Sequence, residues 1–303
     1  MHPAILLVRD TARELTGRKV YYCPNPGNAG DALIAHATYN LLREHSLEYL
    51  IVPYQRAAER DLRDQIVVFG GGGSFNALFG AAARFVERFA PGARRLIVLP
   101  QTVASHEALL GSLGEHVTLF CRERVSFQHA RAHARRARVQ VAEDLVLSLD
   151  VAKELHGAAP LKWHLPRRRK WLRAELEFQW RRWRKARSDR GAGTEGVLNC
   201  FRGGLDRPDM IPPPDNIDAS ALLGRGVYPE AVAQATARRF LGFLAGFETI
   251  NTNRLHVAIG GALMGKAVNM YPNTYYKNQA VFEFSLKDRF PRVRWMGGAA
   301  TAG

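Results

Sequence analysis

Short apolar runs alternate with amphipathic stretches along this chain, and that alternation limits the folds open to it more than any other feature does. Six apolar runs in the first half are typical of buried strands, and they lie at 19–23, 50–53, 65–69, 95–99, 117–121 and 139–142. Between the first two, residues 32–44 carry apolar side chains at helical spacing. Strands that alternate with helices predict a parallel sheet with helices on both faces. We therefore expect an α/β fold.

The second half repeats this rhythm after an interruption. Three more apolar runs lie at 197–201, 247–250 and 267–271, and helical stretches lie at 229–243, 257–264 and 279–286. The chain has 303 residues, which exceeds the usual size of a single hydrophobic core. We expect two Rossmann-like domains, residues 1–152 and 196–303, joined by residues 153–195.

Polar and glycine-rich loops follow the expected strands of the first half, at the edge where parallel sheets bind ligands. Asp31, in the sequence Gly-Asn-Ala-Gly-Asp at 27–31, can cap the helix at 32–44. Four glycines at 70–73 follow the third strand and match neither a dinucleotide-binding nor a Walker pattern. They either let the backbone approach a ligand or another segment closely, or form a plain tight turn from strand to helix.

The sequence Thr-Asn-Arg-Leu-His at 252–256 lies between an expected strand and the helix at 257–264. Thr252 or Asn253 can cap that helix through its side-chain oxygen. Arg254 and His256 then lie in or just before the first turn, beside unpaired backbone N–H groups. Such a helix start is an anion site. In the alternative interpretation, both side chains are merely solvated.

Positive charge is concentrated in one segment. The net charge is +15, and residues 162–190 hold twelve Lys or Arg against three acids. An apolar stripe at helical spacing is formed by Leu172, Leu176, Trp180 and Trp183. We expect a basic amphipathic helix inserted between the domains, which binds an anionic membrane surface. The alternative is a helix that packs its stripe on its own domain. Nucleic acid is not favoured, because the charge is confined to this segment and no nucleic-acid module is recognisable.

Several classes of protein are excluded. The three cysteines, Cys23, Cys121 and Cys200, form no CxxC pair, so neither a disulfide framework nor a zinc ribbon is expected, as in a reducing cytosol. No signal peptide and no apolar run long enough to span a bilayer is recognisable. We expect a cytoplasmic protein, peripherally associated with the inner face of the cell membrane.

Six short motifs in order identify a family. They lie at 27–31, 70–75, 99–102, 122–123, 254–256 and 275–277, and with them the chain resembles the polysaccharide pyruvyltransferases over residues 19–150 and 196–285. The resemblance implies a fold like that of GT-B glycosyltransferases, with the active site in the cleft. It also implies transfer of pyruvate from phosphoenolpyruvate to a sugar of an exopolysaccharide or cell-surface glycan, expected to be lipid-linked, as a cyclic ketal. The Arg/Trp segment departs from the family pattern. The tail Tyr-Tyr-Lys, in place of Tyr-x-x-Lys, puts the role of Lys277 in doubt.

This chemistry assigns roles on the donor side and requires no metal or organic cofactor. The donor carries a carboxylate and a phosphate, which arginine binds in bidentate fashion. The resemblance associates Arg254 with the donor, and Arg202 is added because it follows the strand at 197–201; Leu255 and Lys277 complete the expected binding residues. His256 can protonate C3 of the donor or the leaving phosphate, because its ordinary pKa lies near neutrality.

On the acceptor side, Asp31 can take a proton from a sugar hydroxyl, and the alternative role for its carboxylate is helix capping alone. Expected hydrogen-bond donors to the sugar or phosphate are Asn28, Gly72, Gly73 and Ser74, and further candidate bases are Glu143 and Asp144. Two other functions stay open from the residues: a GT-B glycosyltransferase that uses a nucleotide-sugar, and a basic protein that binds nucleic acid or membrane.

Overall fold

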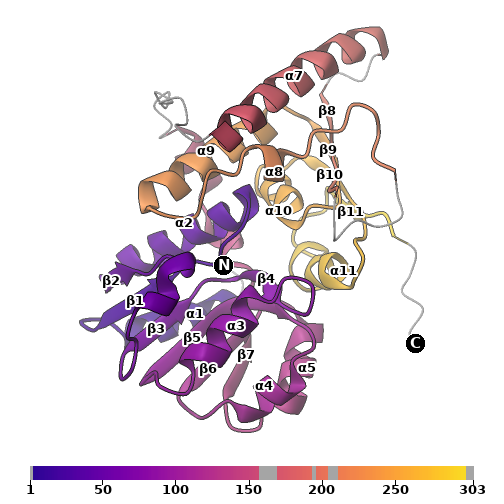
Figure 1. Cartoon of the computed structure of the whole chain (residues 1–303). Coiled ribbons are helices and arrows are strands. Elements are labelled where there is room, and N and C mark those ends of the chain that lie inside the picture. Colours follow the sequence, from indigo (N-terminus) through magenta and orange to yellow (C-terminus); the bar gives the residue numbers. More distant parts are fainter. Residues whose placement is uncertain (1–2, 157–168, 193–195, 204–210, 298–303) are drawn as a thin grey trace. The chain divides into compact units, whose positions relative to one another are not determined.

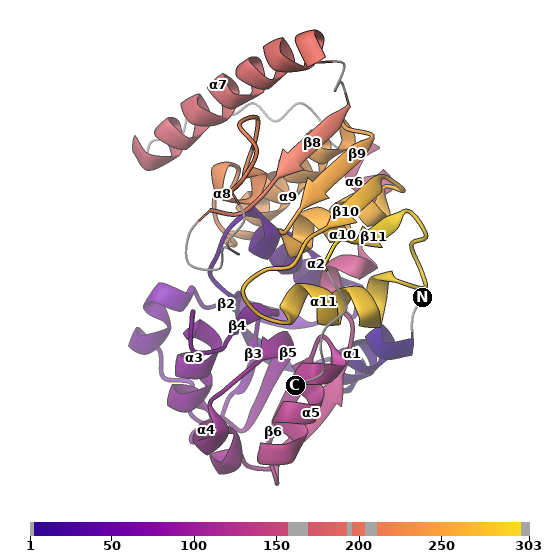
Figure 2. The ribbon, with the colours of Figure 1, turned by 90° about the vertical axis from the view of Figure 1, so that its right-hand side faces the viewer.

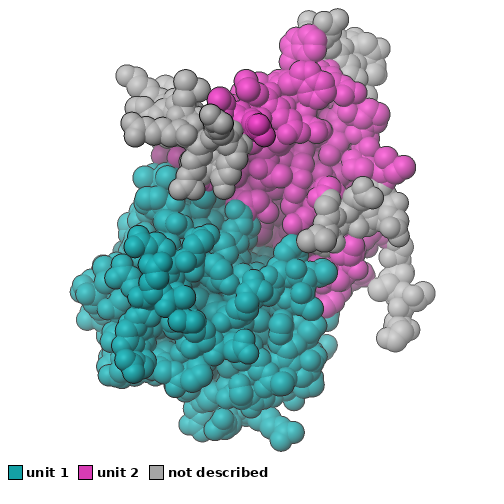
Figure 3. Space-filling view, viewed as in Figure 1, with its two compact units in different colours: residues 1–27, 31–149, 226–234 teal, residues 28–30, 150–225, 235–303 magenta. Residues whose placement is uncertain are grey.

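The computed structural model describes residues 3–156, 169–192, 196–203 and 211–297, and the chain forms two compact units (Figure 3). Unit 1 comprises residues 1–27, 31–149 and 226–234, and unit 2 comprises residues 28–30, 150–225 and 235–303. Each unit is therefore discontinuous in sequence. The domain boundaries expected at 152 and 196 stay a prediction.

Unit 1 is built on a parallel sheet with the strand order β2-β1-β3-β5-β6-β7, and β4 also pairs with β5 (Figure 1). The register is regular in its centre, where Tyr22 lies opposite Ile51 on one side and Val68 on the other. The strands are β1 (Lys19–Cys23), β2 (Glu48–Ile51), β3 (Ile66–Phe69), β4 (Gly72–Phe75), β5 (Arg95–Val103), β6 (Val117–Cys121) and β7 (Arg138–Val141). The expected α/β class with parallel strands is confirmed.

The central strands of unit 1 are largely apolar because both faces of the sheet are covered. Every residue of β3 and of β6 is buried, the pattern of parallel strands that lie between helices. An aromatic cluster packs on them, with the rings of Phe69, Phe85 and Phe89 at successive centroid distances of 4.6 Å. The helices are α1 (Pro3–Glu14), α2 (Ala29–Glu44), α3 (Ala81–Phe89), α4 (Glu107–Ser112) and α5 (Arg124–His133), with short 3-10 turns η1 (Tyr54–Glu59) and η2 (Leu145–Ser148).

The glycine-rich stretch differs from the plain turn that was one of its two interpretations. Its second half is the strand β4, which aligns Gly72 with Gln101 and Phe75 with Val103 of β5, with an irregularity between them. Phe75 is fully buried and holds the strand against the core, and only then does the chain reach α3. The strands β4 and β11 and the helix α1 were not expected from the sequence.

Unit 2 holds a second parallel sheet in the order β11-β10-β9-β8. Its strands are β8 (Val197–Cys200), β9 (Thr249–Thr252), β10 (Ala267–Met270) and β11 (Val293–Trp295). Its helical elements are α6 (Val151–His156), α7 (Arg169–Ala192), α8 (Ala219–Leu222), most of α9 (Glu230–Ala245), α10 (Leu255–Leu263), α11 (Lys277–Val281) and the π-helical turn η3 (Phe282–Leu286). In Figure 2, α7 is the long helix on the outer side of this unit.

The basic segment forms α7 over residues 169–192, while its first part, 162–168, lies outside the described residues. That α7 is an insertion between two Rossmann-like domains stays a prediction. Across the part of the chain that the structure describes, no helix is both long enough and apolar enough to cross a membrane.

Candidate functional site

The loop after β1 leads into α2 three residues earlier than expected. The helix starts at Ala29, and Oδ1 of Asn28 accepts a hydrogen bond from the N–H of Gly30 at 2.8 Å. Asn28 therefore fills the capping position, where a side-chain oxygen satisfies an N–H that has no partner within the helix. The expectation that Asp31 caps this helix is wrong, because Asp31 lies inside the first turn.

Polar side chains hold Asp31 in place at the carboxyl ends of the strands of unit 1. Nδ2 of Asn25 donates to Oδ1 of Asp31 at 3.3 Å, and Oγ of Ser74 donates to Oδ1 of Asn25 at 2.6 Å. Gln101 extends the chain of bonds, because its Oε1 accepts from the N–H of Ser74 at 3.0 Å and its Nε2 donates to the carbonyl of Gly70 at 2.7 Å. We call Asn25, Asp31, Ser74 and Gln101 the carboxylate network.

Two glycines let the backbone approach this network. A Cβ at Gly27 would lie 1.8 Å from Oδ2 of Asp31, and one at Gly72 would lie 2.6 Å from Nδ2 of Asn25. Gly72 also has a φ of 143°, which residues with a Cβ rarely adopt. Of the two interpretations of the glycines at 70–73, close approach thus holds for Gly72, and the group approached is the side chain of Asn25. Gly73 is the next residue of the same strand. Asn25 was missed, although its place directly after β1 could have indicated it.

Arg122 and Asp144 form an ion pair in the core of unit 1. Nη1 of Arg122 lies 3.0 Å from Oδ2 of Asp144, both side chains are 1% exposed, and Nε of Arg122 donates to Thr102 at 2.8 Å. The adjacent Glu123 caps α5 by accepting from a backbone N–H, and burial raises the pKa of its carboxyl group. Asp144 thus compensates a buried charge, and Glu143 beside it is also buried.

In unit 2, basic side chains follow neighbouring strands at one edge of the sheet. Arg202 and Arg254 each come two residues after a strand end, and those ends, Cys200 and Thr252, lie opposite each other. The backbone N–H of Arg202 donates to Oδ1 of Asn253 at 2.7 Å. The parallel register therefore brings the two arginine positions together.

Lys277 follows the third strand of this edge and begins α11. Its side chain is 7% exposed, and Nζ lies 4.9 Å from the centre of the Tyr275 ring. The neighbouring Asn278 ties this turn to the loop after β9, because its Nδ2 donates to the carbonyl of Asn253 at 2.7 Å. Lys277 is therefore held close to the sheet edge that carries the two arginines.

The helix α10 begins at Leu255, and Arg254 is its capping residue, with an extended backbone. The expected cap by Thr252 or Asn253 is wrong. The hydroxyl of Thr252 accepts from the N–H of Arg254 at 2.9 Å and donates to the carbonyl of Cys200 at 2.6 Å, so it shapes the turn before the helix. The first turn then contains Leu255, whose side chain is buried, and the half-buried His256.

The guanidinium group of Arg254 is oriented by Asp218, a residue the sequence did not indicate. Nε of Arg254 donates to Oδ1 of Asp218 at 2.9 Å, and Nη2 bonds the second carboxylate oxygen. The side chains are 8% and 18% exposed, so this bidentate pair is largely shielded from water. Asp218 lies in a stretch rich in proline and glycine that reads as a loop, and no local signal links it to Arg254.

The imidazole of His256 packs on the backbone of Gly30, which belongs to the same unit. A Cβ at Gly30 would lie 2.4 Å from Nδ1 of His256 and 2.9 Å from its Cβ. Gly224 packs against the same segment, because a Cβ at Gly224 would lie 3.3 Å from the Cα of Asn28. Segment 28–30 thus leaves room for the histidine only because glycine occupies position 30. We call Arg202, Arg254, His256 and Lys277 the cationic cluster.

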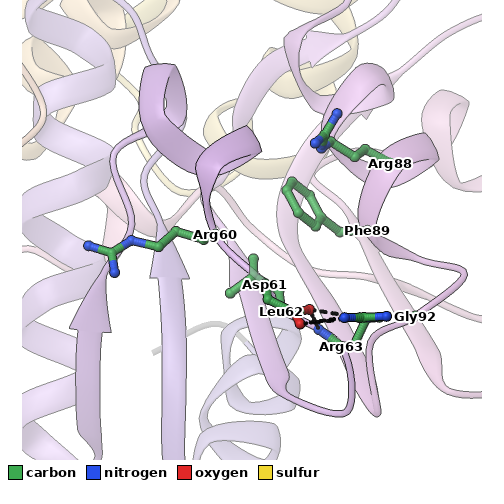
Figure 4. Close-up of a pocket in the computed structure, with 7 residues that line it drawn as sticks. All are labelled: Arg60, Asp61, Leu62, Arg63, Arg88, Phe89 and Gly92. Atoms are coloured by element: carbon green, nitrogen blue, oxygen red, sulfur yellow. Dashed lines mark hydrogen bonds and ion pairs between the residues drawn. The ribbon is translucent and has the colours of Figure 1, made fainter.

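A hollow of about 240 Å³ on unit 1 contains none of the predicted residues (Figure 4). It is lined by Arg60, Asp61, Leu62, Arg63, Arg88, Phe89 and Gly92. Nη2 of Arg63 and Oδ2 of Asp61 lie 2.7 Å apart within it.

Elsewhere on unit 1, ligand atoms of Glu107, His129 and His133 lie within 4.8 Å of one another, close enough to share a metal ion. Both places are separate from the residues that the motifs singled out.

Two of the comparisons with known proteins name pyruvyl transferases, and a third finds a solved structure of similar fold. A family model described as "Polysaccharide pyruvyl transferase" matches residues 28–275, a range that contains every predicted site residue except Lys277. The curated protein named "Putative pyruvyl transferase EpsO", from Bacillus subtilis (strain 168), is 22% identical over an aligned length of 295, and the alignment covers 87% of this chain and 84% of that protein. A crystal structure of a functionally uncharacterized protein from Klebsiella pneumoniae subsp. pneumoniae NTUH-K2044 superposes with a TM-score of 0.75 at 27% identity, over 98% of this chain and 100% of the other.

Proposed function

Because the chain belongs to the polysaccharide pyruvyl transferase family, we propose that it transfers pyruvate from phosphoenolpyruvate to a sugar of a bacterial exopolysaccharide or cell-surface glycan. The product is a cyclic ketal, and inorganic phosphate is released. In the reaction, C3 of the donor gains a proton and C2 bonds two sugar hydroxyl oxygens, each of which loses its proton. One of these two protons balances the one gained at C3, and the other ends on the released phosphate. The bond from C2 to the phosphate oxygen breaks, and phosphate leaves with the electron pair.

The observation that carries the donor assignment is the cationic cluster at one edge of the sheet in unit 2. Arg202, Arg254 and Lys277 follow three neighbouring strands, and the first turn of α10 adds backbone N–H groups. A donor with a carboxylate and a phosphate needs several cations and benefits from the positive end of a helix. Asp218 holds Arg254 by Nε and Nη2, so the guanidinium has one orientation, and we expect Nη1 and the second N–H of Nη2 to bind the donor with little loss of side-chain freedom.

His256 is the proposed acid. It occupies the second position of α10 within the cationic cluster, and its ordinary pKa lies near neutrality. A protonated imidazole at this position can deliver a proton to C3 or to the departing phosphate.

Asp31 is the proposed base for the acceptor hydroxyl. Its carboxylate accepts from Asn25, so one oxygen is oriented by the carboxylate network. Asn28, Gly72, Gly73 and Ser74 are proposed to border the sugar or phosphate. The hydroxyl of Ser74 already donates to Asn25, so this serine contributes through the network.

The proposal includes a GT-B-like pair of Rossmann-like domains, a lipid-linked acceptor and a location at the inner face of the cell membrane. It requires neither a metal nor an organic cofactor, since protonation and phosphate departure make C2 electrophilic. The two parallel sheets, one in each unit, support the GT-B-like pair of Rossmann-like domains.

The test is incubation of the protein with a synthetic or lipid-linked sugar and phosphoenolpyruvate or a UDP-sugar, with phosphate release and product mass as readouts. Phosphate release with phosphoenolpyruvate and a ketal-sized mass gain are expected. Transfer from the UDP-sugar instead would overturn the proposal in favour of a glycosyltransferase. His256→Gln should keep the fold and donor binding but lose turnover, because glutamine cannot deliver a proton at neutral pH.

A further inference from the structure

Among the described side chains of the basic helix α7, those of one face pack on the rest of unit 2. Phe178 is 2% exposed and packs edge-on against Phe243, with ring centres 5.0 Å apart. Beside it, Oε1 of Glu175 accepts from Nη2 of Arg239 at 2.6 Å. Nζ of Lys185 lies 3.0 Å from a carboxylate oxygen that is likewise part of unit 2. This face therefore fixes the rotation of the helix about its own axis.

The opposite face of α7 carries the apolar stripe, and it is exposed. The exposed fractions are 39% for Leu172, 63% for Leu176, 51% for Trp180 and 56% for Trp183. At about 100° per residue, these four side chains lie roughly 120–200° around the helix from Phe178. The alternative in which the stripe packs on its own domain is thus wrong for these residues. Large apolar side chains that are exposed together mark an interaction surface.

Cations border this stripe. Arg173 and Arg184 are exposed, and the guanidinium of Arg184 lies over the ring of Trp180, 5.4 Å from its centre. The exposed acid on this stretch of the helix, Glu177, accepts from Arg181 at 2.8 Å and 2.9 Å. The described part of the outer face therefore combines apolar side chains with a net positive charge.

We propose that this outer face of α7 is a docking surface for an anionic phospholipid membrane, with the stripe in the headgroup boundary and the arginines on the lipid phosphates. Tryptophan favours the interface between water and hydrocarbon, and arginines beside an apolar face are typical of helices that lie in that plane. The inner face of α7 is held by the protein, so the helix lies along the surface rather than across it. Docking needs no substrate and does not rest on the proposed reaction.

The test is co-sedimentation of the full chain with vesicles of phosphatidylcholine alone or mixed with phosphatidylglycerol. Wild type should bind the anionic vesicles, and binding should weaken as salt is raised. The double variant Leu176→Glu/Trp180→Glu should bind at least about tenfold more weakly, because it places charge in the stripe. Leu50→Glu is the matched control, since Leu50 is a 45% exposed apolar residue on β2 and should leave binding unchanged.

A second variant, Arg173→Gln/Arg184→Gln, separates the contribution of charge. Each arginine should strengthen binding to anionic vesicles about fivefold, so the double variant should bind roughly twentyfold to thirtyfold more weakly, with no change in its circular dichroism. Equal sedimentation of wild type and the stripe variant would overturn the proposal. The proposal would also be overturned if wild type were a dimer, the stripe variant were a monomer, and neither bound vesicles. Tighter retention of wild type on DNA than on vesicles at matched salt would overturn it as well.

Discussion

The substitution Gly30→Ala should strongly reduce turnover while it leaves the fold nearly intact. Gly30 is the second residue of α2, and its φ lies outside the left-handed region, so alanine suits the local backbone and gains up to about 1 kcal/mol of helix propensity. Its Cβ, however, would lie 2.4 Å from Nδ1 of His256, where ordinary contact begins at 3.4 Å. The imidazole must therefore move by about 1 Å, and such overpacking costs roughly 1–3 kcal/mol.

The expected consequence is a change in rate rather than in structure. The two contributions to stability partly offset each other, so we expect a loss of about 0–3 kcal/mol in the free energy of unfolding. A catalytic group misplaced by 1 Å reduces turnover by about 10²-fold. Phosphate release measures the turnover, calorimetric titration with phosphoenolpyruvate the donor affinity, and urea denaturation the stability.

Gly242→Ala is the matched control. Gly242 lies in the interior of α9, and a Cβ there would have nothing within 4 Å. This variant should be as stable as wild type or more stable by up to about 1 kcal/mol, with unchanged turnover. If Gly30→Ala turned over at the wild-type rate, the contact between Gly30 and His256 would have no part in the reaction, and the assignment of His256 would fail with it.

Three further predictions concern ion pairs and thiols. Arg254→Ala should weaken phosphoenolpyruvate binding at least about tenfold, as measured by calorimetry. Arg254→Lys should not retain the wild-type affinity, because an ammonium group cannot form the bidentate pair with Asp218. Unchanged affinity in Arg254→Ala would remove this residue from the site. Burial would raise the pKa of Glu175, but hydrogen bonds from Arg239 and Gln179 and the charge of Arg225 lower it to about 2 from an ordinary 4.5. The stability that Glu175 contributes is therefore present above about pH 4.5 and lost as the pH falls toward 2. Glu175→Gln should flatten this part of the pH profile of stability, measured by urea denaturation, and an unchanged profile in this variant would refute the assignment. Burial raises the pKa of the thiols of Cys23 and Cys121, and it raises that of Cys200 to about 12. A disulfide reagent at pH 8 should therefore label none of the three thiols in the native protein and all three in guanidinium chloride. Rapid labelling of one thiol in the native protein would contradict the burial.

The kind of element at each position follows from local pattern. The runs that became β1 and β6 were predicted residue for residue, because each is a short and mostly apolar run, and every residue of β6 is buried. The order of strands and helices then indicated the parallel class, and the carboxyl ends of the strands indicated where Arg202 and Arg254 lie. The order of six motifs indicated the family, which the family model confirmed.

Capping was only partly predictable. Asn28 and Asp31 are both good capping residues three positions apart, and either oxygen could reach an N–H at a helix start. The choice depends on where the helix begins, and segment 28–30 clusters with unit 2. The strand β4 likewise depends on a distant part of the chain. Its glycines are typical of a turn, and they form a strand because β5 extends far enough to pair with them.

The sequence by itself determined the class of fold, the family and the chain positions of the basic residues, because apolar periodicity and short motifs are local properties. Only the tertiary structure decided which groups these residues meet. Asp218 and Arg254 are 36 residues apart, and Gly30 and His256 are farther apart still, so no local pattern connects them. The outward direction of the stripe on α7 was decided in the same way, by the packing of Phe178 and the ion pairs of Glu175 and Lys185. Periodicity gives a helix an apolar face, but the partners of its other face determine which side remains exposed to water.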